Sequence, residues 1–439
     1  MVVELAPDAP LPPVTTADAE QVHDAVVIGA GVIGLSIALR LVLANSARRV
    51  LVLERDSVAA GASRGNAGAY AFSDIEPLAS PGILRKVPRW LFNPLGPLSL
   101  RPGYLPTLAP WLWRFWRASQ PARVSASTTA QTALNRLSAA ATLRLLDAVD
   151  ATSMLHQDGN LHLYESTSQW KASLRGWEAR RAHGIDFEHA HGPHVAERIA
   201  QWQPGLAPGF AAATFVPGWA TIDDPHQLVR RIAGHCASRS VRFARATAKA
   251  ITPLSAVVAV QLDGGCVVFG RHVVIAAGAW SHHLTHSLGD DIPLETERGY
   301  NTTLPPGAFD LRRQLTFPAH GFVVTPVAGG VRVGGAVELA GLNAPPNYQR
   351  SDAMLTKAKR FLPALKVEDG TRWMGFRPSL PDSLPVIGPA RKDSRVLYAF
   401  GHGHLGLTQS AATAEIVEAL IAGQTPTLDI AAFSPRRFV

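Results

Sequence analysis

Hydrophobic residues near the start of the chain follow the pattern of a strand, a helix and a second strand. Residues 26–28 are apolar and run directly into a glycine-rich turn. The apolar positions of Leu35–Leu43 then recur at helical spacing, and the apolar run Val50–Leu53 ends in Glu54. Short, fully apolar strands joined by a helix are typical of a parallel sheet that is buried on both faces. We therefore predict a β-α-β unit at this end of the chain.

Similar segments return in the middle and at the end of the sequence. Asp224-Pro225 is a helix start signal, and the apolar strands Val241–Phe243 and His272–Ala277 follow. Residues between these segments, roughly 150–220 and 285–370, are expected to be rich in β-strands. The simplest fold is α/β, with a discontinuous Rossmann-like domain interleaved with an antiparallel β-sheet substrate domain of α+β type.

These patterns give the domain boundaries. We predict a disordered tail over residues 1–23, a nucleotide-binding domain over 24–78, 221–284 and 372–439, a basic tryptophan-rich helical segment over 79–150, and a substrate-binding domain over 151–220 and 285–371. The tail has neither the basic start nor the apolar run of a signal peptide. Two cysteines are too few for a disulfide framework. We therefore expect a cytoplasmic protein.

The turn after the first strand reads Gly29-x-Gly31-x-x-Gly34, and each glycine has a separate function in holding a dinucleotide. Gly29 permits the tight turn, Gly31 lets the backbone approach a pyrophosphate, and Gly34 lets the helix pack closely on the strand. The helix start then offers its amides to the phosphates. Glu54 is placed to accept hydrogen bonds from an adenosine ribose, and its charge disfavours NADP.

The net charge of +8 comes from one part of the chain. Residues 77–146 contain no acid; their basic residues are Arg85, Lys86, Arg89, Arg101, Arg114, Arg117, Arg123, Arg136 and Arg144, and their tryptophans are Trp90, Trp111, Trp113 and Trp116. Positive charge interleaved with tryptophan suits an anionic membrane surface, so we expect peripheral binding at the inner face of the cytoplasmic membrane. The alternative is a packed helical hairpin with solvated arginines. Nothing nearby resembles a nucleic-acid-binding module, so we expect no nucleic-acid partner.

Three further glycine-rich segments are spread along the chain, over residues 61–68, 278–281 and 401–408. Such separated segments suit a ligand with a nucleotide half and a large flat ring, which must lie close to the backbone. The histidines show no spacing typical of a metal site, and no hydrolase motif is present.

The chain resembles the D-amino-acid oxidase superfamily of FAD-dependent oxidoreductases, and within it the bacterial D-amino-acid dehydrogenases, including the D-proline and hydroxy-D-proline type. The resemblance covers nearly the whole chain from Asp24. Its marks are the first glycine turn with Glu54, Gly61–Gly68, Pro81–Pro102, Gln157–Leu163, Val274–Ser281, Glu297–Tyr300, Trp373–Pro378 with Pro381-Asp382 and Pro385–Gly388, and Gly401–Thr408.

The resemblance implies FAD as the cofactor and assigns roles to individual residues. Arg377 is expected to grip the substrate carboxylate, and His402 to contact the flavin. Tyr300 is expected to close a lid or to donate to the substrate carboxylate, with a packed tyrosine at the rim as the alternative. The residues expected to bind FAD are Gly29, Gly31, Val32, Ile33, Gly34, Glu54, Arg55, Ser63, Asn66, Ala67, Gly68, Gly278, Trp280, Gly403, His404, Leu405, Gly406, Leu407 and Thr408.

The implied reaction is oxidative deamination of a small D-amino acid such as D-proline or hydroxy-D-proline. Hydride would move from Cα to flavin N5, and the electrons would pass to a membrane quinone or another respiratory acceptor. Three alternatives remain open: a sarcosine- or glycine-type amine oxidase that uses oxygen, a non-catalytic flavin-binding subunit of a membrane complex, and an NAD-dependent reductase.

Overall fold

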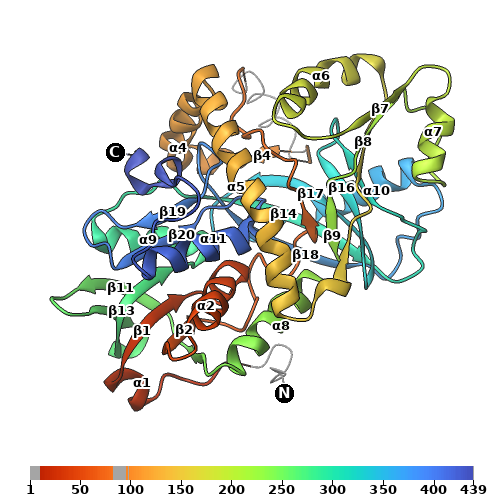
Figure 1. The fold of residues 1–439 in the computed structure, drawn as a ribbon. Helices are drawn as coiled ribbons and strands as arrows, with labels where there is room; N and C mark the ends of the chain where they lie inside the picture. The colour runs from red at the N-terminus through yellow and green to blue at the C-terminus, as the bar shows by residue number, and fades with distance from the viewer. Residues whose placement is uncertain (1–9, 83–94, 97, 439) are drawn as a thin grey trace.

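The computed structural model describes residues 10–82, 95–96 and 98–438, and two large β-sheets lie side by side in it (Figure 1). The first sheet is at the left of Figure 1 and contains both β1, near the N-terminus, and β20, near the C-terminus. The second sheet is at the right and is built from the segments between them. This interleaving confirms the predicted α/β fold with a second, mainly antiparallel sheet.

The first sheet has a parallel centre. Its strands are, in spatial order, β10 (Arg242–Arg245), β2 (Val50–Glu54), β1 (Val22–Ile28), β13 (Val267–Ile275), β12 (Val258–Leu262) and β11 (Ala248–Pro253), with β20 (Val396–Phe400) beside β13 and β19 (Val386–Pro389) beside β20. The pairs of β1 with β2 and with β13 are parallel, as is the pair of β13 with β20. Alternate residues of β1 enter different apolar clusters, because both faces of this sheet are buried.

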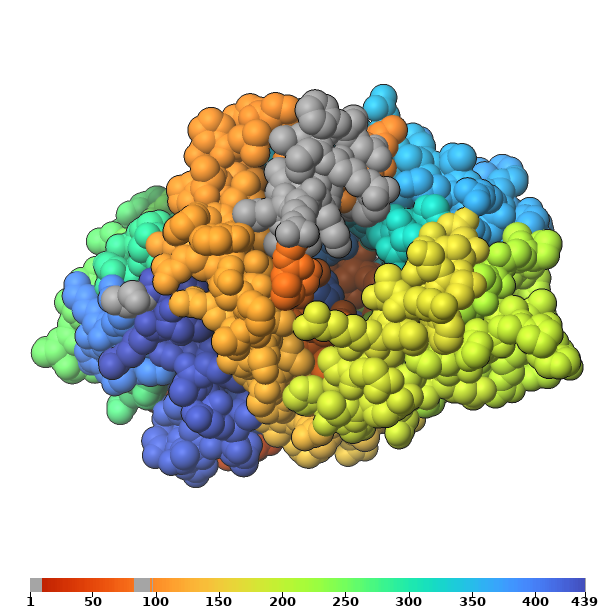
Figure 2. All heavy atoms as spheres, turned by 90° about the horizontal axis from the view of Figure 1, so that it is seen from above, coloured from red at the N-terminus to blue at the C-terminus, as the bar shows by residue number. Residues whose placement is uncertain are grey.

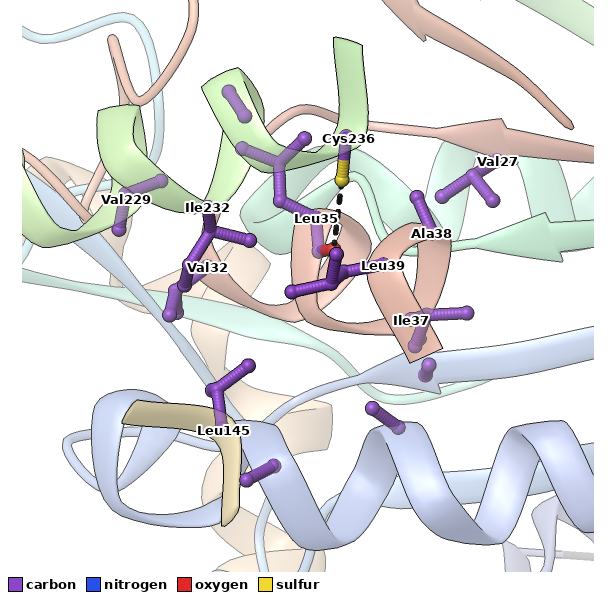
Figure 3. Packing of buried hydrophobic residues seen from close by; sticks show 14 of the residues in the cluster. Val27, Val32, Leu35, Ile37, Ala38, Leu39, Leu145, Val229, Ile232 and Cys236 are labelled. Atoms are coloured by element: carbon purple, nitrogen blue, oxygen red, sulfur yellow. Dashed lines mark hydrogen bonds between the residues drawn. The ribbon is translucent and has the colours of Figure 1, made fainter. Parts of the chain in front are cut away.

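Four helices cover one face of the first sheet. They are α2 (Val32–Ala44), α5 (Pro121–Ala148), α8 (Pro225–Ala237) and α11 (Gly406–Ile421). Figure 3 shows Leu35 and Leu39 of α2 between Ile232 of α8 and Leu145 of α5. The thiol of Cys236 is buried in the same cluster, 3.7 Å from the carbonyl oxygen of Leu35, where it packs as a small apolar group.

The second sheet is mainly antiparallel. Its strands are, in spatial order, β18 (Thr371–Ser379), β14 (Glu295–Leu304), β17 (Gly330–Leu339), β16 (Phe322–Val327), β15 (Gln314–Phe317), β6 (Asn160–Tyr164), β8 (Ala212–Val216) and β7 (Glu188–His191), with β4 (Leu98–Leu100) beside β17. A small third sheet joins β3 (Ala69–Tyr70), β9 (Ala220–Ile222) and β5 (Leu155–His156). The other α-helices in the part of the chain that the structure describes are α1 (Thr16–Glu20), α4 (Leu105–Ala118), α6 (Thr167–Ala182), α7 (Val195–Trp202), α9 (Ser281–Thr285) and α10 (Gln349–Phe361).

The predicted disordered tail is wrong for residues 10–23. Thr15 and Asp18 cap helix α1 reciprocally, because the Thr15 side chain accepts from the Asp18 amide and the Asp18 carboxylate accepts from the Thr15 amide. Asp18 also pairs with Arg242 of the first sheet, and Leu11 is buried. Residues 1–9 of the predicted tail lie outside the described residues.

Two other predicted boundaries need correction. The boundary at residue 372 would divide β18 from the second sheet, yet this strand pairs with β14 over its whole length. The second sheet therefore extends to Ser379. The predicted helical segment 79–150 is also not a separate unit, because α5 packs against α11 and contributes to the core of the first sheet.

The basic tryptophan-rich segment is only partly solvated. Arg101 pairs with Glu338, Arg136 donates to the carbonyl oxygen of His183, and Arg144 pairs with Glu415; Arg85, Lys86, Arg89 and Trp90 lie outside the described residues. No helix in the part of the chain that the structure describes combines the length and the apolar character needed to cross a membrane.

Candidate functional site

A cavity of about 1110 Å³ lies between the first and second sheets. Its walls come from the carboxyl ends of β1 and β2, from residues 60–67, from β14, β17 and β18, and from the start of α11. Seen from above, the surface is hollowed between the orange helices α4 and α5 and the yellow-green region that contains α6 (Figure 2). Residues from all the glycine-rich segments that the sequence singled out line this cavity.

The turn from β1 into α2 leaves no room for side chains at two of its glycines. Gly29 has a φ of 113°, and a Cβ atom there would lie 2.5 Å from the carbonyl oxygen of Ala276. A Cβ atom on Gly34 would lie 2.0 Å from the carbonyl oxygen of Gly29. The helix therefore approaches the strand as closely as the sequence predicts.

The start of α2 lines the cavity through Gly31, Val32 and Ile33. The Val32 amide donates to Ser63 Oγ at 2.9 Å, so a residue of the second glycine-rich loop satisfies one of the amides that a helix start leaves unpaired. The positive end of the helix dipole favours a bound anion at this position.

The Glu54 carboxylate is fixed by the backbone at the end of β2. It accepts hydrogen bonds from the amides of Ala30 at 2.8 Å, Arg55 at 2.9 Å and Asp56 at 3.2 Å. A carboxylate has about four lone-pair sites, so capacity remains for a ligand donor. Glu54 lines the cavity, and its hydrogen bond to a ribose stays a prediction.

A stacked pair forms another part of the wall. The Arg55 guanidinium lies 3.6 Å from the centre of the Trp280 ring, and both residues line the cavity. Gly278, at the start of the same turn, has a φ of 55° and open space where a Cβ would be. This wall therefore offers flat surfaces and free backbone to a ligand.

The loop of residues 61–68 is held by the second sheet. The Asn301 side-chain amide donates to the carbonyl oxygen of Gly65 at 2.6 Å, and Arg332 donates to that of Asn66. The Trp373 indole occupies the space beside Gly65, where a Cβ atom would lie 2.4 Å from the ring. Ser63, Asn66 and Ala67 of this loop line the cavity.

Arg377 of β18 reaches the cavity without a protein partner among the described residues. Its guanidinium lies against Gly299 of β14, where a Cβ atom would be 2.5 Å from Nη2. In the described part of the chain, no hydrogen bond or ion pair within 4.0 Å holds it. Burial lowers the pKa of this guanidinium, and the charge of Glu297 acts in the opposite direction. A partly desolvated cation that faces a cavity is suited to bind an anion.

His404 forms an ion pair on another side of the cavity. Its Nε2 lies 3.0 Å from Asp74 Oδ2, and Arg180 of α6 lies 3.5 Å from the other oxygen of Asp74. Burial alone would lower the pKa of His404, but the hydrogen bond and charge of Asp74 raise it above its ordinary value. Burial likewise opposes ionisation of Asp74, but His404 and Arg180 lower the pKa of its carboxyl.

Two other histidines at the cavity are neutral at physiological pH. Burial lowers the pKa of His402 to about 3, and its Nε2 lies 3.0 Å from Thr413 Oγ1 within α11. Burial and the charge of Arg180 lower the pKa of His162 to about 3. His402 therefore offers the cavity an uncharged imidazole ring.

Most of the predicted site residues line the cavity, but four do not. These are Gly34, Gly68, Leu405 and Thr408. Gly68 has a φ of 66° and lies against the carbonyl oxygen of Ile222, whereas Leu405 packs in an apolar cluster. The Thr408 hydroxyl accepts from the Ala71 amide at 3.0 Å. These four residues shape the surrounding backbone, and their contact with the cofactor stays a prediction.

The prediction that Tyr300 donates to a substrate needs correction. Tyr300 lines the cavity, but its hydroxyl donates to Glu338 at 2.5 Å and accepts from the amide of Asn347 at 3.1 Å. Burial and the hydrogen bond to Glu338 raise the pKa of this hydroxyl. Its neighbour Arg298 is also fully buried, and donates to carbonyl oxygens of the loop 341–345. Both side chains stabilise the second sheet.

The family comparison agrees with this geometry. The family described as FAD dependent oxidoreductase matches residues 24–420. The chain belongs to this family. It is therefore an enzyme that uses FAD, and the match includes both sheets and all the glycine-rich segments around the cavity.

Relatives within the family are similar along nearly their whole length. The chain is 34% identical to a D-amino-acid oxidase of Bradyrhizobium diazoefficiens over 425 residues, which cover 94% of this chain and 98% of that protein. It is 28% identical to a D-amino acid dehydrogenase of Rhizobium johnstonii, with 92% of this chain and 97% of that protein covered.

Solved structures confirm the fold. Glycine oxidase from Geobacillus kaustophilus matches with a TM-score of 0.72 at 20% identity, covering 95% of this chain and 99% of that one. L-proline dehydrogenase from P. horikoshii matches with a TM-score of 0.71 at 18% identity, covering 98% of each chain.

The cavity fits FAD by the groups it presents. The start of α2 and Glu54 suit a pyrophosphate and a ribose, and the long cavity continues to the start of α11. Two buried polar atoms at its wall, Asn301 Oδ1 and Thr325 Oγ1, have no partner in the described chain. A ligand with several hydrogen-bonding groups would satisfy them.

Several cavity residues were not predicted from the sequence, among them Asp74, Glu297, Trp373 and Arg332. Glu297 and Trp373 stand in the motifs that carry the family resemblance, two residues before Gly299 and Gly375. Residues two apart on a strand point to the same face of the sheet. The spacing of Glu297 and Trp373 from these glycines could therefore have indicated that both residues face the cavity. Asp74 lies in an irregular loop and carries no comparable signal.

Proposed function

We propose that this enzyme oxidises D-amino acids, with the substrate carboxylate held by Arg377. The observation that carries the proposal is the Arg377 guanidinium, which faces the cavity without a hydrogen bond or ion pair in the described chain. A guanidinium matches a carboxylate with two parallel hydrogen bonds. The D configuration is supported by the relatives named D-amino-acid oxidase and D-amino acid dehydrogenase.

The side chains around the cavity bind and orient the substrate. Arg377 lies flat against Gly299, so its fork is held in one orientation before the substrate arrives. His402 remains neutral and so adds no charge at the start of α11, whose dipole favours negative charge. Bound FAD supplies the acceptor for the hydride that leaves Cα.

The first test is an anaerobic titration of the purified enzyme while the visible absorbance of its FAD is recorded. D-Proline, hydroxy-D-proline and D-alanine are added, and then their L-enantiomers. Bleaching by the D-forms alone is the expected result. Bleaching by glycine or sarcosine instead, with hydrogen peroxide formed in air, would replace the proposal with an amine oxidase.

Arg377 is tested by Arg377→Met. We expect the Kd for the D-amino acid, taken from the dependence of the reduction rate on concentration, to rise about 10- to 100-fold, because a charge-assisted pair is lost. The matched control is Arg372→Met on the same strand, since Arg372 is exposed and does not line the cavity. Equal effects of the two substitutions would contradict the assigned role.

We further propose that the electrons pass to a quinone at an anionic membrane surface, to which α4 binds. Trp113 and Trp116 of α4 are 58% and 37% exposed, and their ring centres lie 4.7 Å apart. Arg117 is exposed beside them, and Arg123 follows at the start of α5. Exposed indoles next to arginines suit the headgroup region of an anionic bilayer.

Membrane binding is tested with phosphatidylglycerol vesicles and the double variant Trp113→Ala/Trp116→Ala. We expect the wild-type enzyme to sediment with the vesicles and the double variant to remain in solution. Leu254→Ala, which removes an exposed apolar side chain elsewhere, is the control and should bind as the wild type does. Unchanged sedimentation of the double variant would argue against α4 as the contact.

A further inference from the structure

Glu297 is a buried carboxylate at the cavity wall that the fold does not explain. The residue is only 5% exposed, and it lines the cavity from β14. Within the described part of the chain, its carboxylate accepts no hydrogen bond and has no ion pair within 4.0 Å. Burying an ionised carboxylate is costly unless a partner compensates the charge. A ligand is a natural source of that partner.

Glu297 is the direct neighbour of Arg377 across strands β14 and β18. The two charges act on each other, since Glu297 opposes the effect of burial on the Arg377 guanidinium. Arg377, however, bends over Gly299, and the pair stays beyond 4.0 Å. The cavity therefore presents a cation and an anion side by side without a direct contact between them.

We propose that Glu297 binds the amino group of the substrate, beside the carboxylate that Arg377 holds. This inference rests on the proposed oxidation of amino acids. An amino acid carries both charges, so it satisfies Arg377 and Glu297 together. A carboxylic acid without an amino group would neutralise Arg377 and place a second anion beside Glu297.

The charge pair therefore selects amino acids over simple carboxylic acids. It also disfavours binding of the 2-oxo acid, which forms when water hydrolyses the imino acid with loss of ammonia, and which keeps only the carboxylate. Specificity of this kind comes from repulsion of the wrong ligand as much as from attraction of the right one. Glu297 therefore weakens rebinding of the 2-oxo acid in the place of the substrate.

The test uses two unreactive ligands of similar shape. 2-Aminoisobutyrate is a zwitterion without a hydrogen on Cα, and pivalate replaces its amino group by a methyl group. Their Kd values are measured from the change in the visible spectrum of bound FAD, for the wild type, Glu297→Gln and Glu297→Asp. Glu295→Gln is the control, because Glu295 lies on the same strand, bonds to Tyr104 and does not line the cavity.

The wild type should bind 2-aminoisobutyrate more tightly than pivalate. In Glu297→Gln this preference should fall by about 10- to 100-fold, whereas Glu297→Asp and Glu295→Gln should keep most of it. Equal weakening of both ligands, an unchanged preference, or loss of FAD from Glu297→Gln would overturn the inference. Because neither ligand reacts, these results stand apart from the titration with D-amino acids, whose failure would reject the oxidation itself.

Discussion

At the scale of single residues, the ion pair of Asp74 and His404 makes the stability of the folded state depend on pH. The pKa of His404 is raised above its ordinary value of 6.5, so protonation of the histidine favours the folded state. That contribution is complete below pH 6.5 and is lost as the pH rises through the raised pKa. The pKa of Asp74 is lowered from 3.8, so its contribution is lost only in acid.

Asp74→Asn tests this coupling. We expect the Tm of the wild type to be higher than that of the variant, and the difference to be largest at about pH 5.5. The difference should be smaller at about pH 9, because His404 has lost its charge at that pH. A constant difference should remain from the contact of Asp74 with Arg180, which stays charged. Thermal unfolding across this range, with the bound FAD followed by absorbance, measures both parts.

The double variant Asp74→Asn/His404→Gln is the control for the same measurement. Compared with His404→Gln, it should show a difference in Tm that does not change between these pH values. A pH-dependent difference that persists without His404 would assign the coupling to another group.

The site residues that sequence reasoning found are those defined by backbone requirements. Gly29, Gly31 and Glu54 were predicted because a dinucleotide turn demands them at fixed spacing. Tyr300 and Asp74 show the limit of this reasoning. Whether a tyrosine hydroxyl faces a substrate or a buried glutamate depends on contacts between strands and loops, which no local pattern specifies.

At the scale of elements, the packing of α2 on β1 requires that Gly34 has no side chain. In Gly34→Ala the new Cβ would meet the carbonyl oxygen of Gly29 at 2.0 Å. Because this neighbour is backbone, relief requires α2 to move away from the turn. We expect the free energy of unfolding to fall by about 1–3 kcal/mol, and FAD to bind more weakly.

Chemical denaturation and FAD titration of Gly34→Ala check this expectation. Gly103→Ala is the matched control, since a Cβ at Gly103 meets nothing within 4 Å and its φ is not positive. If Gly34→Ala kept the stability and the FAD affinity of the wild type, α2 would be able to move away from the turn without loss of free energy.

The sequence predicted that most of the helices and strands exist, but it did not predict as well which other elements they pack against. Helix α5 was expected as a helix, but its place in the core was not. Its buried positions include Gln131, Thr132, Asn135 and Ser138, which no apolar pattern reveals. Asn135 is buried because its amide donates to the carbonyl oxygens of the loop that contains Asp74. In a sequence, a polar residue that is buried by one tertiary contact looks the same as a polar residue that is exposed to solvent.

At the scale of the whole molecule, the cavity is the junction between the two sheets. Loop 61–68 belongs in sequence to the first sheet, yet Asn301 and Arg332 of the second sheet hold it. A cofactor that fills the cavity contacts both sheets at once. Its binding energy should therefore stabilise the complete fold and not the first sheet alone.

Removal and return of FAD tests this arrangement. We expect the apoenzyme to unfold at a lower Tm, and each addition of FAD to raise Tm, with a gain of about 4 kcal/mol at a thousandfold excess over Kd. At the same concentration AMP, which matches only the groups at β1, α2 and Glu54, should raise Tm much less, because it leaves the second sheet without a ligand and therefore has a larger Kd. If AMP protected as well as FAD at equal concentration, the energy of binding would come from the first sheet alone, and the junction would be stable without the flavin ring.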